Sequence, residues 1–168
     1  MPEGGPRYEL IEGELLMAPA PNRFHQDISL NLETILWSYV KKHRIGKIYH
    51  APFDVFLDEI NVVQPDIVFV SNKKADVLTD AGAEGAPDLV IEILSPSTMR
   101  RDRDAKRKVY ARTGVEELWL VDPEKRRIEI FELQANARAP RRIIGEQEIF
   151  TVPRFPELEI SAAEIFAA

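Results

Sequence analysis

The sequence predicts a mixed α/β fold in which helices flank one central β-sheet. Three observations support this class: a helical run at residues 25–42, two strongly apolar strand-like runs at 62–70 and 87–94, and a second helix at 101–112 followed by further strands. Helices and strands that are mixed in this way usually pack around a single sheet. The length of 168 residues suits one ordinary domain, and we expect residues 1–168 to form it.

The first part of the chain predicts an N-terminal β-hairpin and a long helix. Residues 8–17 form two short apolar arms around Glu12 and Gly13, and glycine favours a tight turn because it adopts positive φ without steric cost. Prolines then interrupt regular structure. The helix at residues 25–42 is predicted from an apolar stripe with spacings of three and four, which consists of Ile28, Leu32, Ile35, Leu36, Tyr39 and Val40.

The middle and the end of the chain predict the strands of the sheet. Residues 53–58 alternate between apolar and polar, whereas 62–70 and 87–94 are almost continuously apolar, which is typical of central strands covered on both faces. Pro65 cannot donate to a strand ladder, so it indicates a strand start, an edge or a bulge near Asp66. Gly114 ends the second helix, and strands follow at 117–122 and 127–133. The second of these alternates cleanly and is expected to be half-exposed.

Composition and charge exclude several function classes. The chain has 22 Lys and Arg against 28 Asp and Glu, a net charge of −6, and is 45% apolar, as in soluble globular proteins. Its apolar runs fall short of the roughly 18 residues of a membrane helix, and its start lacks the basic and apolar parts of a secretory signal. We therefore expect no membrane contact. Cysteine is absent, which excludes thiolate metal sites and a cysteine nucleophile and favours a reducing cytoplasm as the location.

Common catalytic motifs are absent as well. The sequence contains no GxxxxGK[ST] phosphate loop, no GxGxxG turn, no GxSxG elbow and no HExxH pair. The three histidines, His25, His43 and His50, form no pair at i and i+4. A metal site in this chain would therefore depend mainly on carboxylates, which favour hard ions such as Mg²⁺ or Mn²⁺.

Two carboxylates lie within otherwise apolar strands. Asp66 and Glu92 each interrupt such a run, where an ionised carboxylate is costly unless it is paired or binds a cation. On neighbouring strands the two could point into one cleft and hold a divalent ion, which polarises a phosphodiester and helps to generate hydroxide. The alternative is that each acid is a strand-end residue paired with an arginine of the nearby helix.

A basic segment follows the second of these strands. Residues 100–108 contain six basic and two acidic residues, within a chain that is acidic as a whole. Such a concentration of positive charge suggests contact with a polyanion, with a salt-dependent affinity. The alternative is a solvated helix face with ion pairs at i and i+4, which is the usual role of charge runs.

Several segments resemble one family. They are YELIEGEL at 8–15, HQ at 25–26, VQPD at 63–66, EGAPDLVIEILSPST at 84–98 and YARTGVEELWLVDP at 110–123. In this order they are similar to the Uma-two family of restriction-endonuclease-like proteins, in the PD-(D/E)XK nuclease superfamily. The resemblance is strongest over residues 8–133. It implies a restriction-endonuclease-like core, with a central mixed β-sheet flanked by helices, and a DNA phosphodiesterase site that depends on Mg²⁺ or Mn²⁺.

The resemblance also implies a set of site residues. Asp66 and Glu92 match the two acids of the superfamily motif and become metal ligands, and the backbone carbonyl of Ile93 becomes a third ligand. Leu94 stands where the motif has its lysine. The resemblance assigns that role to Lys106 on the following helix, a lysine that positions the attacking water and stabilises the charge on the phosphorane.

Further residues are expected around this centre. His25 matches a family position at the start of the first helix and is expected at the catalytic cleft, and Gln64 is expected directly behind the metal ligands. Four arginines of the basic segment are expected to hold the DNA backbone, and these are Arg100, Arg101, Arg103 and Arg107. A structural hydrogen bond at the entry of the helix is the alternative role for His25.

Two functions from different classes remain open at this level. The first is a metal-dependent endonuclease that cuts DNA, with RNA as a less favoured substrate. The second is a catalytically inactive module that binds nucleic acid or takes part in an assembly, which Leu94 and the acidic net charge favour. Because one site makes one cut, we expect an enzyme of duplex DNA to be a homodimer, formed through the strand near Phe131 or through the C-terminal segment.

Overall fold

The computed structural model describes residues 6–96 and 102–168 and confirms the mixed α/β class. Its centre is a mixed sheet of six strands in which β9 and β10 are parallel and the other neighbours are antiparallel. The order across this sheet is β12 (Arg142–Gly145), β11 (Arg127–Glu132), β10 (Glu117–Asp122), β9 (Leu89–Ile93), β6 (Ile67–Ser71) and β3 (Gly46–His50).

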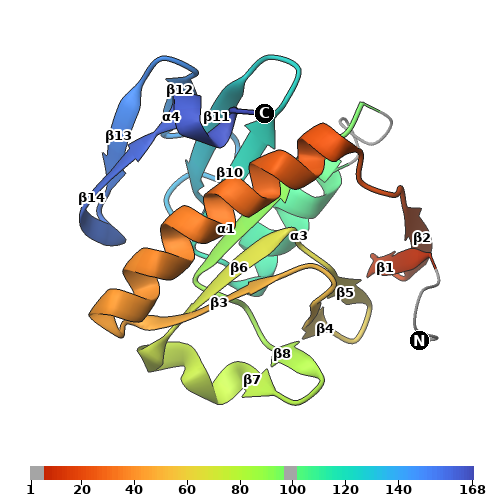
Figure 1. The fold of residues 1–168 in the computed structure, drawn as a ribbon. Coiled ribbons are helices and arrows are strands. Elements are labelled where there is room, and N and C mark those ends of the chain that lie inside the picture. The colour runs from red at the N-terminus through yellow and green to blue at the C-terminus, as the bar shows by residue number, and fades with distance from the viewer. Residues whose placement is uncertain (1–5, 97–101) are drawn as a thin grey trace.

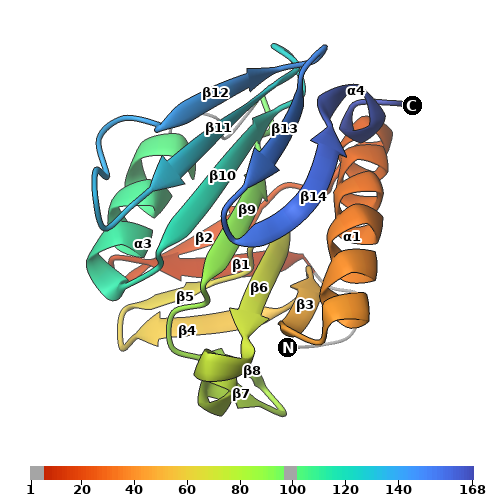
Figure 2. The same ribbon diagram turned by 90° about the vertical axis from the view of Figure 1, so that its left-hand side faces the viewer.

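Helices cover both faces of the central sheet (Figure 2). α1 (Arg23–His43) lies on one face, while the π-helical turn η2 (Asp102–Lys106) and α3 (Arg107–Thr113) lie on the other. The alternation of side chains along β10 separates the two cores, since Trp119 packs with the α1 side and Leu118 and Leu120 pack with the α3 side. Within the described part of the chain, no helix has the length and apolar character needed to cross a membrane.

α1 confirms the long helix expected from the apolar stripe. Its buried residues are Ile28, Leu32, Leu36 and Val40. Asn22 caps its N-terminus, because the side-chain oxygen accepts a hydrogen bond from the backbone N–H of His25 at 2.8 Å. The helix therefore begins at a fixed place beside the loop that leads out of the N-terminal hairpin (Figure 1).

The N-terminal hairpin is confirmed and belongs to a second sheet. β1 (Arg7–Ile11) and β2 (Glu14–Ala18) pair around Glu12 and Gly13, which both have positive φ. The order of this sheet is β2, β1, β5 (Asn61–Val63), β4 (Asp54–Asp58), β8 (Gly82–Glu84) and β7 (Leu78–Thr79). Ile11, Val55 and Val63 join the apolar cluster on the α3 side, so the hairpin adjoins that face of the central sheet.

The prediction of one strand over residues 62–70 is wrong. Two strands replace it, β5 in the second sheet and β6 in the central sheet, and the residues between them are Gln64, Pro65 and Asp66. Pro65 has no N–H to continue a ladder, and the N–H of Gln64 bonds to the carboxylate of Glu9 at 2.8 Å instead of to a strand. Asp66 therefore lies directly before a strand, not inside one.

The prediction of a half-exposed strand over residues 127–133 is also wrong. Four of the six residues of β11 are buried, because both neighbouring strands pair with it and side chains from η2 and α3 cover one face. The guanidinium of Arg107 lies 5.5 Å from the ring centre of Phe131, which is fully buried. The side chain of Phe131 is therefore not part of an exposed dimer surface.

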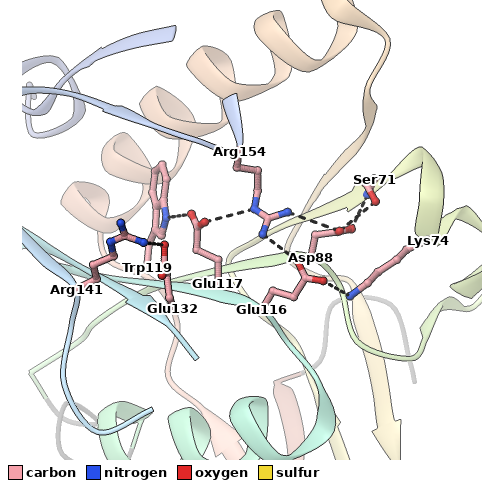
Figure 3. A network of polar contacts seen from close by, with 9 residues as sticks. All are labelled: Ser71, Lys74, Asp88, Glu116, Glu117, Trp119, Glu132, Arg141 and Arg154. Atoms are coloured by element: carbon pink, nitrogen blue, oxygen red, sulfur yellow. Dashed lines mark hydrogen bonds and ion pairs between the residues drawn. The ribbon is translucent and has the colours of Figure 1, made fainter. Parts of the chain in front are cut away.

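The C-terminal segment forms a hairpin that packs beside α1. β13 (Ile149–Val152) pairs with β14 (Phe155–Ser161), and the short helix α4 (Ala162–Ile165) follows it. Arg154, at the turn between these strands, attaches the hairpin to the central sheet through a polar network (Figure 3). Its guanidinium contacts Glu116 at 3.0 Å and Glu117 at 3.4 Å, and lies 3.6 Å from Asp88. The short helix η1 (Asn72–Val77) brings Lys74 to 3.5 Å from Glu116.

The two adjacent glutamates of this network are expected to affect stability in opposite directions as pH changes. Burial raises the pKa of Glu117, against the hydrogen bond from Trp119 and the charge of Arg154. Desolvation also acts on Glu116, but hydrogen bonds and charges from Arg154 and Lys74 outweigh it and lower the pKa. A raised folded-state pKa means that the folded chain holds the proton longer, so stability falls as pH rises above the ordinary value of 4.5.

Urea unfolding of wild type, E117Q and E116Q at several pH values between 4 and 7 measures this difference. We expect wild type to lose stability relative to E117Q as the pH rises, because ionised Glu117 is the disfavoured form. Relative to E116Q, wild type gains stability over the lower part of this range, because the folded state favours ionised Glu116. The same sign for both variants would contradict these assignments.

Candidate active site

The pairing of β6 with β9 places the two predicted carboxylates opposite each other. In this antiparallel pair Ile67 faces Ile91. One further step along the register puts Asp66 opposite Glu92, on the α3 side of the sheet, since side chains alternate between faces. Residues that face each other across antiparallel strands have Cβ atoms about 5 Å apart. The sheet therefore brings the two acids together on one face.

Both carboxylates line a cavity of about 360 Å³. Its walls come from the N-terminal hairpin, the start of α1, the ends of β9 and β10, and η2. The loop at residues 18–22 closes one side. The ionisable side chains that line the cavity are Arg7, Glu9, His25, Asp66, Glu92, Lys106 and Glu124.

Asp66 is buried, with 6% of its surface exposed, and two neighbouring groups hold its carboxylate in place. One carboxylate oxygen accepts a hydrogen bond from the backbone N–H of Ile93 at 2.7 Å. The other lies 3.3 Å from Nε2 of His25. The structure therefore places His25 in the lining of the cavity, next to Asp66. The backbone N–H of His25 also donates to the side chain of Asn22, so this residue takes part in the cap of α1 as well.

Lys106 reaches the same cavity from η2. Its ammonium lies 2.5 Å from Oε1 of Glu92, and only 3% of the residue is exposed. Tyr110, four residues later and on the same side of the helix, donates a hydrogen bond to the same oxygen at 2.5 Å. Leu94 is buried in the apolar cluster on the α3 side. The lysine expected from the following helix is therefore brought to the acid.

Two further residues of the cavity were missed by sequence reasoning. Glu9 on β1 accepts a hydrogen bond from Lys106 at 2.9 Å, so the ammonium lies between two carboxylates. Arg7, on the same strand, donates to the carbonyl oxygen of Gln64 at 3.2 Å. The alternation along β1 could have indicated Glu9, because this residue shares the buried face of the strand with Ile11. A carboxylate on a buried face needs a partner.

Gln64 contacts two other strands beside the cavity. Its backbone N–H holds Glu9, and its side-chain amide donates to Asp54 at 2.7 Å. Its Oε1 is buried and has no hydrogen-bond partner among the described residues. The segment that carries Asp66 is therefore attached to both β1 and β4.

The donors present fit a single hard cation. Asp66 and Glu92 supply carboxylate oxygens in one cavity, and Ile93, also in its lining, supplies a backbone carbonyl. Within residues 6–96 and 102–168, no group of three or more His, Asp and Glu side chains forms a complete metal site. Magnesium does not need such a group, because it is usually bound by one or two carboxylates together with water and substrate phosphate.

Two arginines of the basic segment are less available to bind DNA than the charge of the segment suggests. The guanidinium of Arg103 pairs with the buried Glu129 at 2.6 Å, and Arg107 lies over Phe131 and within 3.4 Å of Asp104. Lys108 is exposed. Arg100 and Arg101 lie outside the described residues. The structure thus places Arg103 and Arg107 against the sheet and does not bring them into the lining of the cavity.

Comparisons with known proteins agree with this fold, and the family match supports a nuclease function. The model of the Uma2 family, described as "Putative restriction endonuclease", matches residues 1–163. Among solved structures, a protein from Anabaena variabilis described as "a putative nuclease belonging to DUF820" is 24% identical, with a TM-score of 0.79. That alignment covers 99% of this chain and 93% of the other. No curated protein sequence matches the chain.

The family match extends over nearly the whole chain, from the N-terminal hairpin to α4, and includes every segment that lines the cavity. The structural likeness independently supports the mixed α/β architecture. The chain belongs to the Uma2 family, which is the family that its sequence segments resemble.

Proposed function

We propose that this protein is a metal-dependent endonuclease that hydrolyses phosphodiester bonds of DNA. The observation that carries the proposal is the arrangement of Asp66, directly before β6, and Glu92 on β9, which line one cavity together with Lys106. Family membership supports nuclease activity. The cation, the substrate and the residue roles below are our proposal.

Each residue has a proposed role in this reaction. Asp66, Glu92 and the carbonyl of Ile93 would hold Mg²⁺ or Mn²⁺, an ion that neutralises phosphate charge and lowers the pKa of bound water. His25 and the N–H of Ile93 orient Asp66. Lys106 orients the attacking water and stabilises the negative charge that develops on the phosphorus oxygens. Arg100 and Arg101 of the basic segment are the proposed contact with the DNA backbone, because Arg103 and Arg107 already pair within the fold.

A catalytically inactive module is the second candidate. The buried Leu94 at the usual lysine position favours it, since the family scaffold is then retained without that group. In this case nucleic acid would bind without regard to divalent cations or to Asp66.

Calorimetric titration of Mn²⁺ into wild type, D66N and D80N tests the proposed function. We expect about one ion per chain in wild type, no measurable binding in D66N, and wild-type binding in D80N, which removes the same charge at an exposed turn. Supercoiled plasmid should then be nicked by wild type and D80N in Mn²⁺ but not by D66N.

Each other outcome has a definite meaning. Metal-independent plasmid binding by folded wild type, without nicking, would support the inactive module. Cleavage of RNA but not of plasmid would keep the site and change the substrate. A D66N protein as active as wild type would contradict the assignment of the metal ligand.

A further inference from the structure

Lys106 is shared by two carboxylates that belong to different parts of the fold. Glu92 lies on β9 of the central sheet, and Glu9 lies on β1 of the second sheet. The ammonium is 2.5 Å from Oε1 of Glu92 and 2.9 Å from Oε1 of Glu9. All three side chains are more than nine-tenths buried, so water screens these charges weakly.

The two carboxylates differ in the other groups that they bind. The proposed function makes Glu92 a metal ligand, and a cation on Glu92 would repel the ammonium that contacts the same carboxylate. Glu9 is held by contacts of its own, since it accepts the backbone N–H of Gln64 at 2.8 Å and lies on a strand paired on both sides. Its negative charge therefore remains available to the lysine when Glu92 binds a cation.

We propose that Glu9 is a positioning residue, which holds the ammonium of Lys106 in the cavity when Glu92 is engaged by a divalent cation. The inference rests on the proposed function and goes beyond the family motif, because it assigns a role to the N-terminal hairpin. Glu9 touches neither the cation nor the substrate in this arrangement, and it acts through Lys106.

The substitution E9Q separates this role from a structural one. Glutamine keeps the length of the side chain and an oxygen that accepts the Gln64 N–H, but it removes the charge that faces the ammonium. The matched control is E12Q. Glu12 is an exposed residue of the same hairpin, paired with Arg112 at 2.5 Å, so E12Q removes the same charge away from the cavity.

The direct readout is the ammonium signal of Lys106 in a nitrogen-15 correlation spectrum, identified by its absence in K106M. Lysine ammonium protons are observed when ion pairs protect them from exchange with water. We expect the signal to persist with saturating Mg²⁺ in wild type and E12Q. In E9Q we expect it without Mg²⁺, where Glu92 holds the lysine, and expect it to disappear when Mg²⁺ is added.

Kinetics supply the second readout. We expect E9Q to lower kcat on plasmid by about 10- to 100-fold, the usual effect of removing a partner that orients a functional group, with KM unchanged. E12Q should leave both constants unchanged. An E9Q signal that survives saturating Mg²⁺, or a wild-type signal that Mg²⁺ abolishes, would overturn the inference. The second result does not depend on the folding of E9Q.

The failure of this inference can be told apart from the failure of the proposed function. Mn²⁺ titration of wild type tests the metal site without any change at Glu9, and its failure would remove the proposed function and the premise of the inference together. Metal binding in wild type combined with an E9Q protein that retains both the lysine signal and kcat would remove the role of Glu9 alone.

Discussion

Replacing Lys106 with methionine is expected to lower kcat on plasmid DNA by about 100- to 1,000-fold, the usual effect of removing a group that stabilises transition-state charge. Methionine preserves an apolar stem of similar length but removes the ammonium between Glu9 and Glu92. Mn²⁺ binding should persist and become tighter, because the positive charge next to Glu92 is gone. Calorimetry and single-turnover cleavage measure the two effects separately.

The same substitution is expected to destabilise the protein in the absence of metal. It leaves two buried carboxylates without their shared cation, which costs about 3–5 kcal/mol when a buried ion pair is broken. A divalent cation at Glu92 compensates part of this charge, so Mn²⁺ should raise the Tm of K106M more than that of wild type.

The control for Lys106 is K108M. Lys108 is exposed and lies two residues further along the same segment, so it matches the chemical change outside the cavity. We expect K108M to retain wild-type kcat and stability. K106M with the activity of wild type would exclude Lys106 from the reaction.

The sequence was sufficient to predict the elements on which the site is built. Periodicity predicted α1 and the apolar runs of β9 and β10, because a buried stripe or a doubly covered strand leaves a clear pattern. The carboxylates Asp66 and Glu92 were recognisable because each interrupts such a run. Pro65 correctly indicated irregular backbone near Asp66, and the structure shows a strand start there.

The pairing of distant segments was beyond the reach of these patterns. Whether residues 62–70 form one strand or two depends on which strands pair with each half, and the two halves join different sheets. The role of Glu9 depends on a contact with Lys106, which is 97 positions away. Periodicity reports which face of an element is buried, but it does not say which element covers that face.

β11 illustrates a second limit of predicting burial from a sequence pattern. Its alternation of charged and apolar residues is typical of a strand with one face in water, yet the face that carries Glu129 is covered. The arginines of the basic segment make this possible, because Arg103 supplies the counter-charge for a buried carboxylate. Two charged segments that looked solvated when considered separately thus neutralise each other in the fold.

Replacing Arg103 with methionine is expected to destabilise the fold by about 3 kcal/mol, which is the lower end of the cost of breaking a buried ion pair. Glu129 is 2% exposed and would retain Arg127 at 3.9 Å as its charged neighbour. One of its oxygens already lacks a hydrogen-bond partner among the described residues. Urea unfolding of R103M, with K108M as the exposed control, measures the cost.

A double variant shows whether the loss of stability in R103M comes from the buried carboxylate of Glu129, which no longer has its main partner. R103M/E129M no longer contains the buried carboxylate that R103M leaves without its main partner, so we expect it to be more stable than R103M alone, as when both partners of a buried pair are replaced by apolar groups.

The salt dependence of DNA binding separates the two roles considered for Arg103. If Arg103 contacts a phosphate, R103M should reduce the magnitude of the slope of log affinity against log salt by about 1. We expect R103M to lose stability and keep the slope, because its guanidinium is already bound to Glu129; a lower slope with unchanged stability would assign Arg103 to the DNA backbone instead.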